Sequence, residues 1–299
     1  MSSLENVFYI QAGLGVLANI FLLFFYSSII LGDRPKPMDL ISCQLTFIHI
    51  MMILTGGDNM FAKILEKLKL GNDVKCKTTF YISRVMRGLS ICITCLLSVF
   101  QAVTISPSTS LLAKFKHKVK KHIIYAFFYL WSFNLSFSSR WIFYVVGFTN
   151  VSDTHQMKVT KSCSLVPMNY IIRGLNLTET MSRDIFLVGI MLTTSVYMVI
   201  ILRRHQRQCK HLHSISHLRA SPEKRATQTI LLLVVFFVVM YWVDFIISVT
   251  SFLLWIYDPV ILNVQKVVMY AYPTITPLLQ ISSDKRIISV LKNLYYKCH

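Results

Sequence analysis

The chain has 299 residues, of which 54% are hydrophobic and only 15% are charged, and its formal net charge is +18. Soluble domains carry about 25% charged residues, so this sequence has too few to cover a water-facing surface and indicates a helix bundle in lipid. The Lys and Arg residues stand in short segments between long apolar runs, which is typical of basic cytosolic loops and argues against nucleic-acid binding.

Seven apolar windows reach or approach the roughly 20 residues that a helix needs to cross a bilayer. They lie near residues 7–31, 39–57, 77–105, 122–147, 183–203, 227–254 and 264–281. The second and the seventh are shorter and contain polar breaks, so six spanning helices are the main alternative. The sequence therefore predicts an all-α membrane protein, with a single seven-transmembrane-helix bundle over residues 1–299. The Ser221-Pro222 pair, a helix cap followed by proline, marks the expected start of the sixth helix.

The distribution of Lys and Arg predicts an extracellular N-terminus and a cytosolic C-terminus in a multi-pass plasma-membrane protein. With this orientation the cytosolic segments contain eighteen of these residues and the outer segments seven. Glycosylation sequons at Asn150 and Asn176 fall in the long loop expected after the fourth helix, on the outer side. A third sequon at Asn134 lies within the fourth helix, where glycosylation is not expected.

Two of the seven cysteines, Cys76 and Cys163, lie in outer segments, where the environment is oxidising. A disulfide between them would fasten the long outer loop over the bundle and restrict its conformational freedom. Two free thiols are the alternative.

Ionisable residues within the apolar windows are candidates for function, because they are costly to place in lipid. One interpretation is structural: an arginine pairs with Asp244 and the others reach the interface. The other is a positively charged cavity in the outer half of the bundle, with aromatic walls, that takes an anionic or strongly hydrogen-bonding small molecule. The candidate pocket residues are Arg84, Arg87, Arg140, Tyr241, Asp244 and Tyr270.

The basic cytosolic loops are the expected surface for membrane lipid headgroups or for a cytosolic partner. Their candidate residues are Lys116, Lys120, Lys224 and Arg225. No glycine-rich phosphate loop, nucleophile elbow or HExxH motif is present, so neither an enzyme, a cofactor nor a metal site is expected. Pro273 and Pro277 permit a kink in the last helix.

Five segments resemble the vomeronasal type 1 receptors, a family of pheromone-sensing G-protein-coupled receptors. The resemblance is nearly collinear from the first helix to the last and is carried by DRPKPMDLISCQLT (33–46), FYISRVMRGLSICITCLLSVFQAVTISP (80–107), SPEKRATQTILLL (221–233), VMYWVDFIIS (239–248) and YAYPTITPL (270–278).

The resemblance implies a sensory receptor for small volatile or steroid-like, often sulfated, ligands that acts through an inhibitory-class G protein, for which the basic cytosolic loops are the expected docking surface. It also supports the Cys76–Cys163 disulfide and glycosylation at Asn150. Bitter-taste-type receptors are the alternative within this class, and a small seven-helix transporter is the alternative outside it, although no inverted repeat is visible.

The chain departs from the wider rhodopsin-like superfamily in three helices. The third ends in FQAVTISP without an acidic-Arg-aromatic triplet, the sixth has no proline, and the seventh lacks Asn-Pro-x-x-Tyr. The activation rules of that superfamily therefore do not transfer to this chain. A pair between Arg87 and Asp244 that responds to activation is a hypothesis from their spacing alone.

Overall fold

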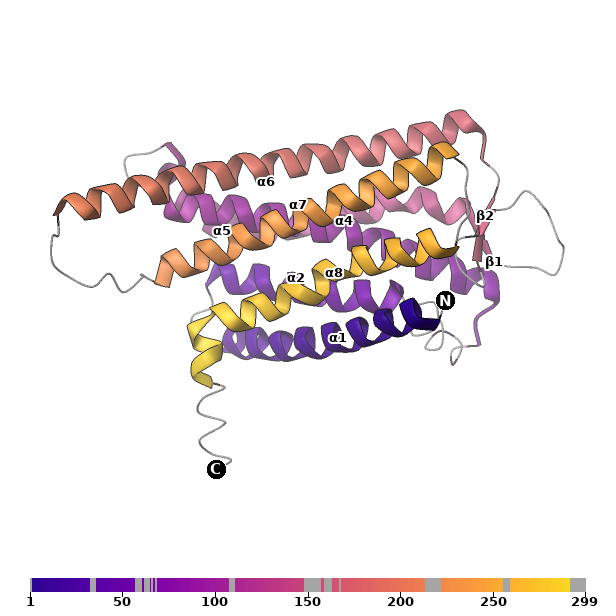
Figure 1. Ribbon diagram of the computed structural model, residues 1–299, viewed down its shortest axis with the longest axis horizontal. Coiled ribbons are helices and arrows are strands. Elements are labelled where there is room, and N and C mark those ends of the chain that lie inside the picture. Colours follow the sequence, from indigo (N-terminus) through magenta and orange to yellow (C-terminus); the bar gives the residue numbers. More distant parts are fainter. Residues whose placement is uncertain are drawn as a thin grey trace, which may run out of the picture.

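Seven long helices run roughly alongside one another in the described chain (Figure 1). They are α1 Ser2–Leu31, α2 Pro37–Gly56, α4 Asn72–Ile105, α5 Leu111–Ser138, α6 Tyr170–Leu212, α7 Pro222–Leu254 and α8 Pro259–Ser283. The computed structural model describes residues 2–32, 36–56, 61, 65, 67, 69–107, 111–147, 157–158, 163–166, 168–212, 222–254 and 259–290.

Four of the described helices are long and apolar enough to cross a membrane: Asn6–Leu31, Pro37–Gly56, Asn72–Ile105 and Tyr170–Arg204. A shorter apolar stretch, Val234–Ile247, lies within α7. Large side chains such as Phe24, Phe128 and Phe186 are exposed on the outside of the bundle. Such an apolar surface is expected where lipid rather than water surrounds the helices.

Helix α4 lies at the centre of the bundle and contacts α2, α5, α6 and α7. In its most apolar window 78% of the residues are buried, against 22–56% in the other three membrane-length helices. Small residues let neighbouring backbones approach it closely, as is usual between helices in lipid. At Gly88, an added Cβ would collide with the side-chain oxygen of Asn134 on α5.

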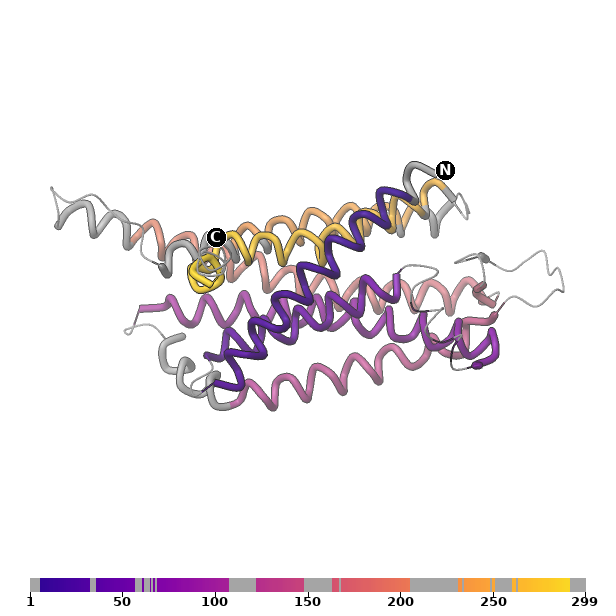
Figure 2. Tube along the Cα trace, turned by 90° about the horizontal axis from the view of Figure 1, so that it is seen from below, coloured from indigo at the N-terminus to yellow at the C-terminus, as the bar shows by residue number. Residues whose placement is uncertain are grey.

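Helix α1 crosses the bundle obliquely in Figure 2 and packs against α2 and α8. Pro277 has no N–H, so it cannot make the usual helical bond to the Pro273 carbonyl four residues earlier. Asn19 Nδ2 donates to that carbonyl at 2.8 Å and to the Gly15 carbonyl at 2.7 Å. A side chain of α1 thus satisfies a backbone group that proline leaves open in α8.

A small three-stranded sheet of order β1-β3-β2 closes one end of the bundle. Its strands are Val145–Gly147, Met157–Lys158 and Cys163–Leu165. A disulfide joins Cys76 on α4 to Cys163 on β3, with 5.7 Å between their Cα atoms, which confirms the predicted bridge. We call this the disulfide end. The N-terminus lies at this end and the C-terminus at the opposite one (Figure 1).

At the opposite end, one arginine ties the chain that follows α8 to the start of α2. Arg286 Nη2 donates to Asp39 at 2.8 Å and to Asp284 at 2.9 Å. These carboxylates, Asp39 foremost, raise the pKa of Arg286 above its ordinary value. Asp39 is buried and also accepts a hydrogen bond from the Lys36 N–H.

The structure differs from the predicted ranges most in the fourth and fifth helices. Helix α5 ends at Ser138, and the apolar stretch beyond it forms a 3₁₀ turn, η1 Ser139–Phe143, and then β1. Helix α6 begins at Tyr170 rather than near 183, because its first turns carry polar side chains that lower hydropathy without breaking the helix.

The expected position of one glycosylation sequon is wrong. Asn176 lies on α6 rather than in a loop, and it is buried at 7% exposure. Asn134 is fully buried on α5, as expected of a residue at membrane depth. Asn150 lies outside the described residues. Helix α7 begins at Pro222, which confirms the predicted start.

Substituting Gly147 should loosen the sheet from the bundle. A Cβ at this position would lie 2.8 Å from backbone atoms of both Asn72 and Asp73, so backbone must shift. We expect Gly147→Ala to lower the free energy of unfolding by about 1–3 kcal/mol, measured by thermal unfolding of the detergent-solubilised protein. Gly174→Ala is the control, because no atom lies within 4 Å of its added Cβ. Equal melting temperatures for the two variants would contradict the prediction.

The carboxylate of Asp73 should protect the backbone amide of Gly147. It accepts a hydrogen bond from the Gly147 N–H at 3.1 Å and pairs with Lys77 at 2.7 Å. Asp73→Ala removes the acceptor, and we expect hydrogen exchange at Gly147 to become about fivefold faster, the usual worth of one hydrogen bond. Lys77→Ala is the control, because it removes only an exposed ion pair of small value. Equal acceleration in both variants would show that the hydrogen bond contributes nothing of its own.

Candidate functional site

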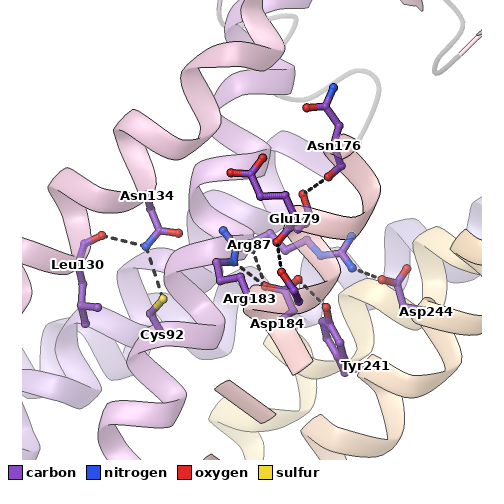
Figure 3. Close-up of polar contacts among 12 residues, drawn as sticks. Arg87, Cys92, Leu130, Asn134, Asn176, Glu179, Arg183, Asp184, Tyr241 and Asp244 are labelled. Atoms are coloured by element: carbon purple, nitrogen blue, oxygen red, sulfur yellow. Dashed lines mark hydrogen bonds and ion pairs between the residues drawn. The ribbon is translucent and has the colours of Figure 1, made fainter. Parts of the chain in front are cut away.

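A buried ion pair joins two helices in the middle of the bundle (Figure 3). Arg87 on α4 pairs with Asp244 on α7, and Asp244 is only 3% exposed. From α8, Gln265 Nε2 donates to the other oxygen of Asp244 at 2.9 Å, and Met269 Sδ accepts from Arg87 at 3.6 Å. The structure confirms that these two residues pair, and it adds α8 as a third contributor.

A second buried carboxylate, that of Asp184 on α6, lies beside that of Asp244. Asp184 accepts hydrogen bonds from the Tyr241 hydroxyl at 2.5 Å and from Arg183 Nε at 2.7 Å (Figure 3). Tyr241 is three residues before Asp244, so both face inward from α7. The two carboxylates therefore tie α7 to α4, α6 and α8.

Asp184 and Arg183 were not among the candidate residues from the sequence, because they stand at the edge of the apolar window. The sequence carries no clear signal for Asp184, because apolar residues occur on all sides of this helix. The stripe that leads back to Asp184, residues 188, 191, 195 and 198, is visible only from their burial in the structure.

A cavity of about 410 Å³, counted with the space at its open side, borders the ion pair. Its only charged lining residues in the described chain are Arg87 and Asp244, which neutralise each other. Thioethers and aromatic rings make up most of the wall, and Phe237 packs edge-on against Tyr272 with ring centroids 4.6 Å apart. The lining residues are Met52, Arg87, Ser90, Ile91, Phe237, Met240, Tyr241, Asp244, Met269 and Tyr272.

Three of the six predicted pocket residues, Arg87, Tyr241 and Asp244, line this cavity. Tyr270 does not, since its ring lies against Gly56 of α2 and Phe8 of α1. Arg140 belongs to η1, where it pairs with Glu179 of α6.

Arg84 also lies outside the lining, one turn from Arg87 toward the disulfide end. Its guanidinium is 5.0 Å from the ring centroid of Phe80 and 4.7 Å from that of Trp141. Among the described residues it has no carboxylate partner.

The expected excess of positive charge is largely absent from this part of the bundle. Asp184 and Glu179, which were not counted from the sequence, offset Arg183 and Arg140. Together with the Arg87–Asp244 pair, this leaves Arg84 as the cation without an ionic partner in the described region.

The four predicted partner-facing residues lie at the end far from the disulfide. Lys116 and Lys120 fall in the first turns of α5, and Lys224 and Arg225 fall in the first turn of α7. Both helix starts lie at the same end of the bundle as the C-terminus (Figure 1). Within the described residues, His, Cys, Asp and Glu side chains form no group of three that could hold a metal ion.

Comparisons with known proteins agree with this architecture. Residues 2–293 match the family model described as "Vomeronasal organ pheromone receptor family". The chain is 40% identical over 292 residues to vomeronasal type-1 receptor 90 of Rattus norvegicus, covering 97% of this chain and 94% of the relative. It is 36% identical over 293 residues to vomeronasal type-1 receptor 45 of Mus musculus, covering 97% and 92%.

The fold is also similar to that of squid rhodopsin. The two superpose with a TM-score of 0.73 at 15% sequence identity, over 99% of this chain and 85% of the rhodopsin chain. At that identity the likeness concerns the fold alone.

Removing one member of the ion pair should cost more than removing both. Arg87→Gln leaves the buried carboxylate of Asp244 without its cation, and we expect a loss of about 3–5 kcal/mol in stability. The double variant Arg87→Gln/Asp244→Asn replaces both charges with amides and should recover most of that loss. Thermal unfolding of the solubilised protein measures the coupling. Additive effects of the two substitutions would show that the pair contributes no coupling energy.

Proposed function

This chain belongs to the family of vomeronasal type 1 pheromone receptors. We propose that it binds a small, steroid-like ligand in the Arg87–Asp244 cavity and that it activates an inhibitory-class G protein. It is a G-protein-coupled receptor of the plasma membrane rather than an enzyme. The observation that carries the proposal is the cavity, which borders an ion pair shared by three helices.

The position of the ion pair suggests how a ligand changes the bundle. A ligand can shift a conformational equilibrium only through contacts that differ between the two states. A ligand that contacts Arg87, Tyr241 and Met269 touches α4, α7 and α8 at once. A change in the Arg87–Asp244 contact then alters how α7 lies against α4, and α7 carries Lys224 and Arg225 at its far end.

The chemistry of the wall favours an apolar ligand body. Met52, Met240 and Met269 are unbranched and polarizable, so they adapt to ligands of irregular shape. Phe237, Tyr241 and Tyr272 add aromatic surface. A rigid hydrocarbon skeleton of the steroid type matches the apolar character of such a lining.

Two arginines, Arg87 and Arg84, could bind an anionic group on that ligand. Arg87 is already paired, so an anion reaches it only by competing with Asp244. Arg84 has no carboxylate partner in the described chain and is held by aromatic rings alone. We therefore assign the anionic end of a sulfated ligand to Arg84, which such a ligand reaches by extending beyond the present cavity lining toward the disulfide end.

The remaining features follow the proposed orientation, with the N-terminus outside and the C-terminus in the cytosol. The disulfide end then faces the outside. Asn150, which follows β1 by three residues in the sequence, is the proposed glycosylation site. The starts of α5 and α7, in which the basic residues fall, are then at the cytosolic end, where the G protein binds.

The test is a calcium assay in cells that express the chain together with a promiscuous G protein. A sulfated steroid should evoke a response at a concentration at least about tenfold lower than its neutral counterpart. Arg84→Ala should remove this difference, because one charge-assisted contact is worth about 1.5–3 kcal/mol. Arg87→Ala should change the response to both ligands.

Coupling is tested in the same cells without the added G protein. The sulfated steroid should lower cyclic AMP, and a toxin that inactivates inhibitory α-subunits should abolish the effect. Equal responses to both steroids, unchanged by Arg84→Ala, would refute the cationic subsite. A ligand-evoked current without any G protein would refute the receptor mechanism.

A further inference from the structure

The buried hydroxyl of Ser90, on the wall of the cavity, has no partner among the described residues. Its side chain is 2% exposed, and its Oγ has no hydrogen bond within the described chain. Ser90 lines the cavity one turn below Arg87 on α4. Buried polar groups are nearly always hydrogen-bonded, so an exception on a cavity wall calls for an explanation.

Other buried hydroxyls on the same helix do have partners. Thr94 Oγ1 donates to the Ser90 carbonyl at 2.7 Å and lies 2.9 Å from the Tyr272 hydroxyl. Ser98 Oγ lies 2.6 Å from Thr194 Oγ1 on α6. The lack of a hydrogen-bond partner is therefore specific to Ser90 and is not shared by Thr94 and Ser98 on the same helix.

The other polar groups of the cavity wall are already engaged. Arg87 and Asp244 hold each other, and Gln265 occupies the second oxygen of Asp244. The hydroxyl of Tyr241 donates to Asp184, and that of Tyr272 is bonded to Thr94. Within the described lining, a ligand therefore finds its open hydrogen-bonding group at Ser90.

We infer that Ser90 binds a neutral oxygen, a hydroxyl or a carbonyl, at the inner end of the ligand. This inference rests on the proposed function and specifies the ligand class further. A serine hydroxyl both donates and accepts, so it suits either group. A charged group is disfavoured there, because the neighbouring wall consists of Met52, Ile91 and Phe237 and Arg87 is already paired.

The spacing along α4 defines the shape of that ligand. Arg84 and Ser90 are six residues apart, which corresponds to about 9 Å of helix rise and to directions about 120° apart around the helix axis. Arg87 stands midway between them, so a molecule with an anionic group at Arg84 and a neutral oxygen at Ser90 passes Arg87 and has the two groups at opposite ends. Its middle is apolar, because it passes the thioether and aromatic wall.

The test uses two 3-sulfated androstanes that differ only at carbon 17, where one has a carbonyl and the other a methylene. On the wild-type receptor the carbonyl compound should be about fivefold more potent, the usual worth of one neutral hydrogen bond. Ser90→Ala should remove that difference and leave the response to the methylene compound unchanged. The variant should fold normally, because the hydroxyl has no protein partner to lose within the described chain.

Ser98→Ala is the matched control. It removes a buried hydroxyl from the same helix outside the cavity lining, so it should keep the preference for the carbonyl compound. Receptor at the cell surface is measured for each variant, and thermal stabilisation of the purified receptor reports binding directly. If the wild type does not distinguish the two compounds, or Ser90→Ala still does, the role of Ser90 is overturned while the receptor function stands. If neither compound activates or stabilises the wild type, both proposals are overturned.

Discussion

The carboxylate of Asp244 holds together the half of the bundle in which the cavity lies. In lipid a buried charge is tolerable only when a counter-charge and further hydrogen bonds accompany it. Arg87 supplies the first from α4 and Gln265 the second from α8. Because two helices must each present a partner to a group on a third, the relative positions of all three are tightly defined. A ligand that redistributes those bonds acts on all three helices together.

The second organising constraint is that every polar backbone group in lipid needs a partner. Pro277 leaves the Pro273 carbonyl open, and Asn19 fills that need from α1. At the position where α8 lacks a helical hydrogen bond, it instead makes a contact with α1. This position is next to Tyr272, which lies on the cavity wall. A ligand that contacts Tyr272 therefore lies close to the irregular part of α8.

Much of this architecture could be predicted from the sequence, because long apolar runs and cysteines in outer segments have few alternative uses in a membrane. The Arg87–Asp244 pair was predictable for a different reason: a carboxylate within a membrane-spanning helix needs a cation as its partner. Asp184 was missed because it stands at the edge of the apolar window, where hydropathy does not distinguish a buried polar side chain from one at the membrane interface. The separation of Arg84, Arg140 and Tyr270 from the cavity depends on packing against Trp141, Glu179 and Gly56, which no periodicity reveals.

The close packing of Tyr270 against Gly56 restricts how related receptors can diverge. A Cβ at position 56 would overlap the Tyr270 ring, so any side chain there requires a smaller residue at 270. Relatives at 36–40% identity differ from this chain at most positions. Residues of the cavity wall such as Met240 can be replaced one at a time, and each replacement changes which ligand the receptor prefers. A side chain at position 56 can appear only together with a smaller residue at position 270, so receptors that lack Gly56 should show a compensating replacement at 270.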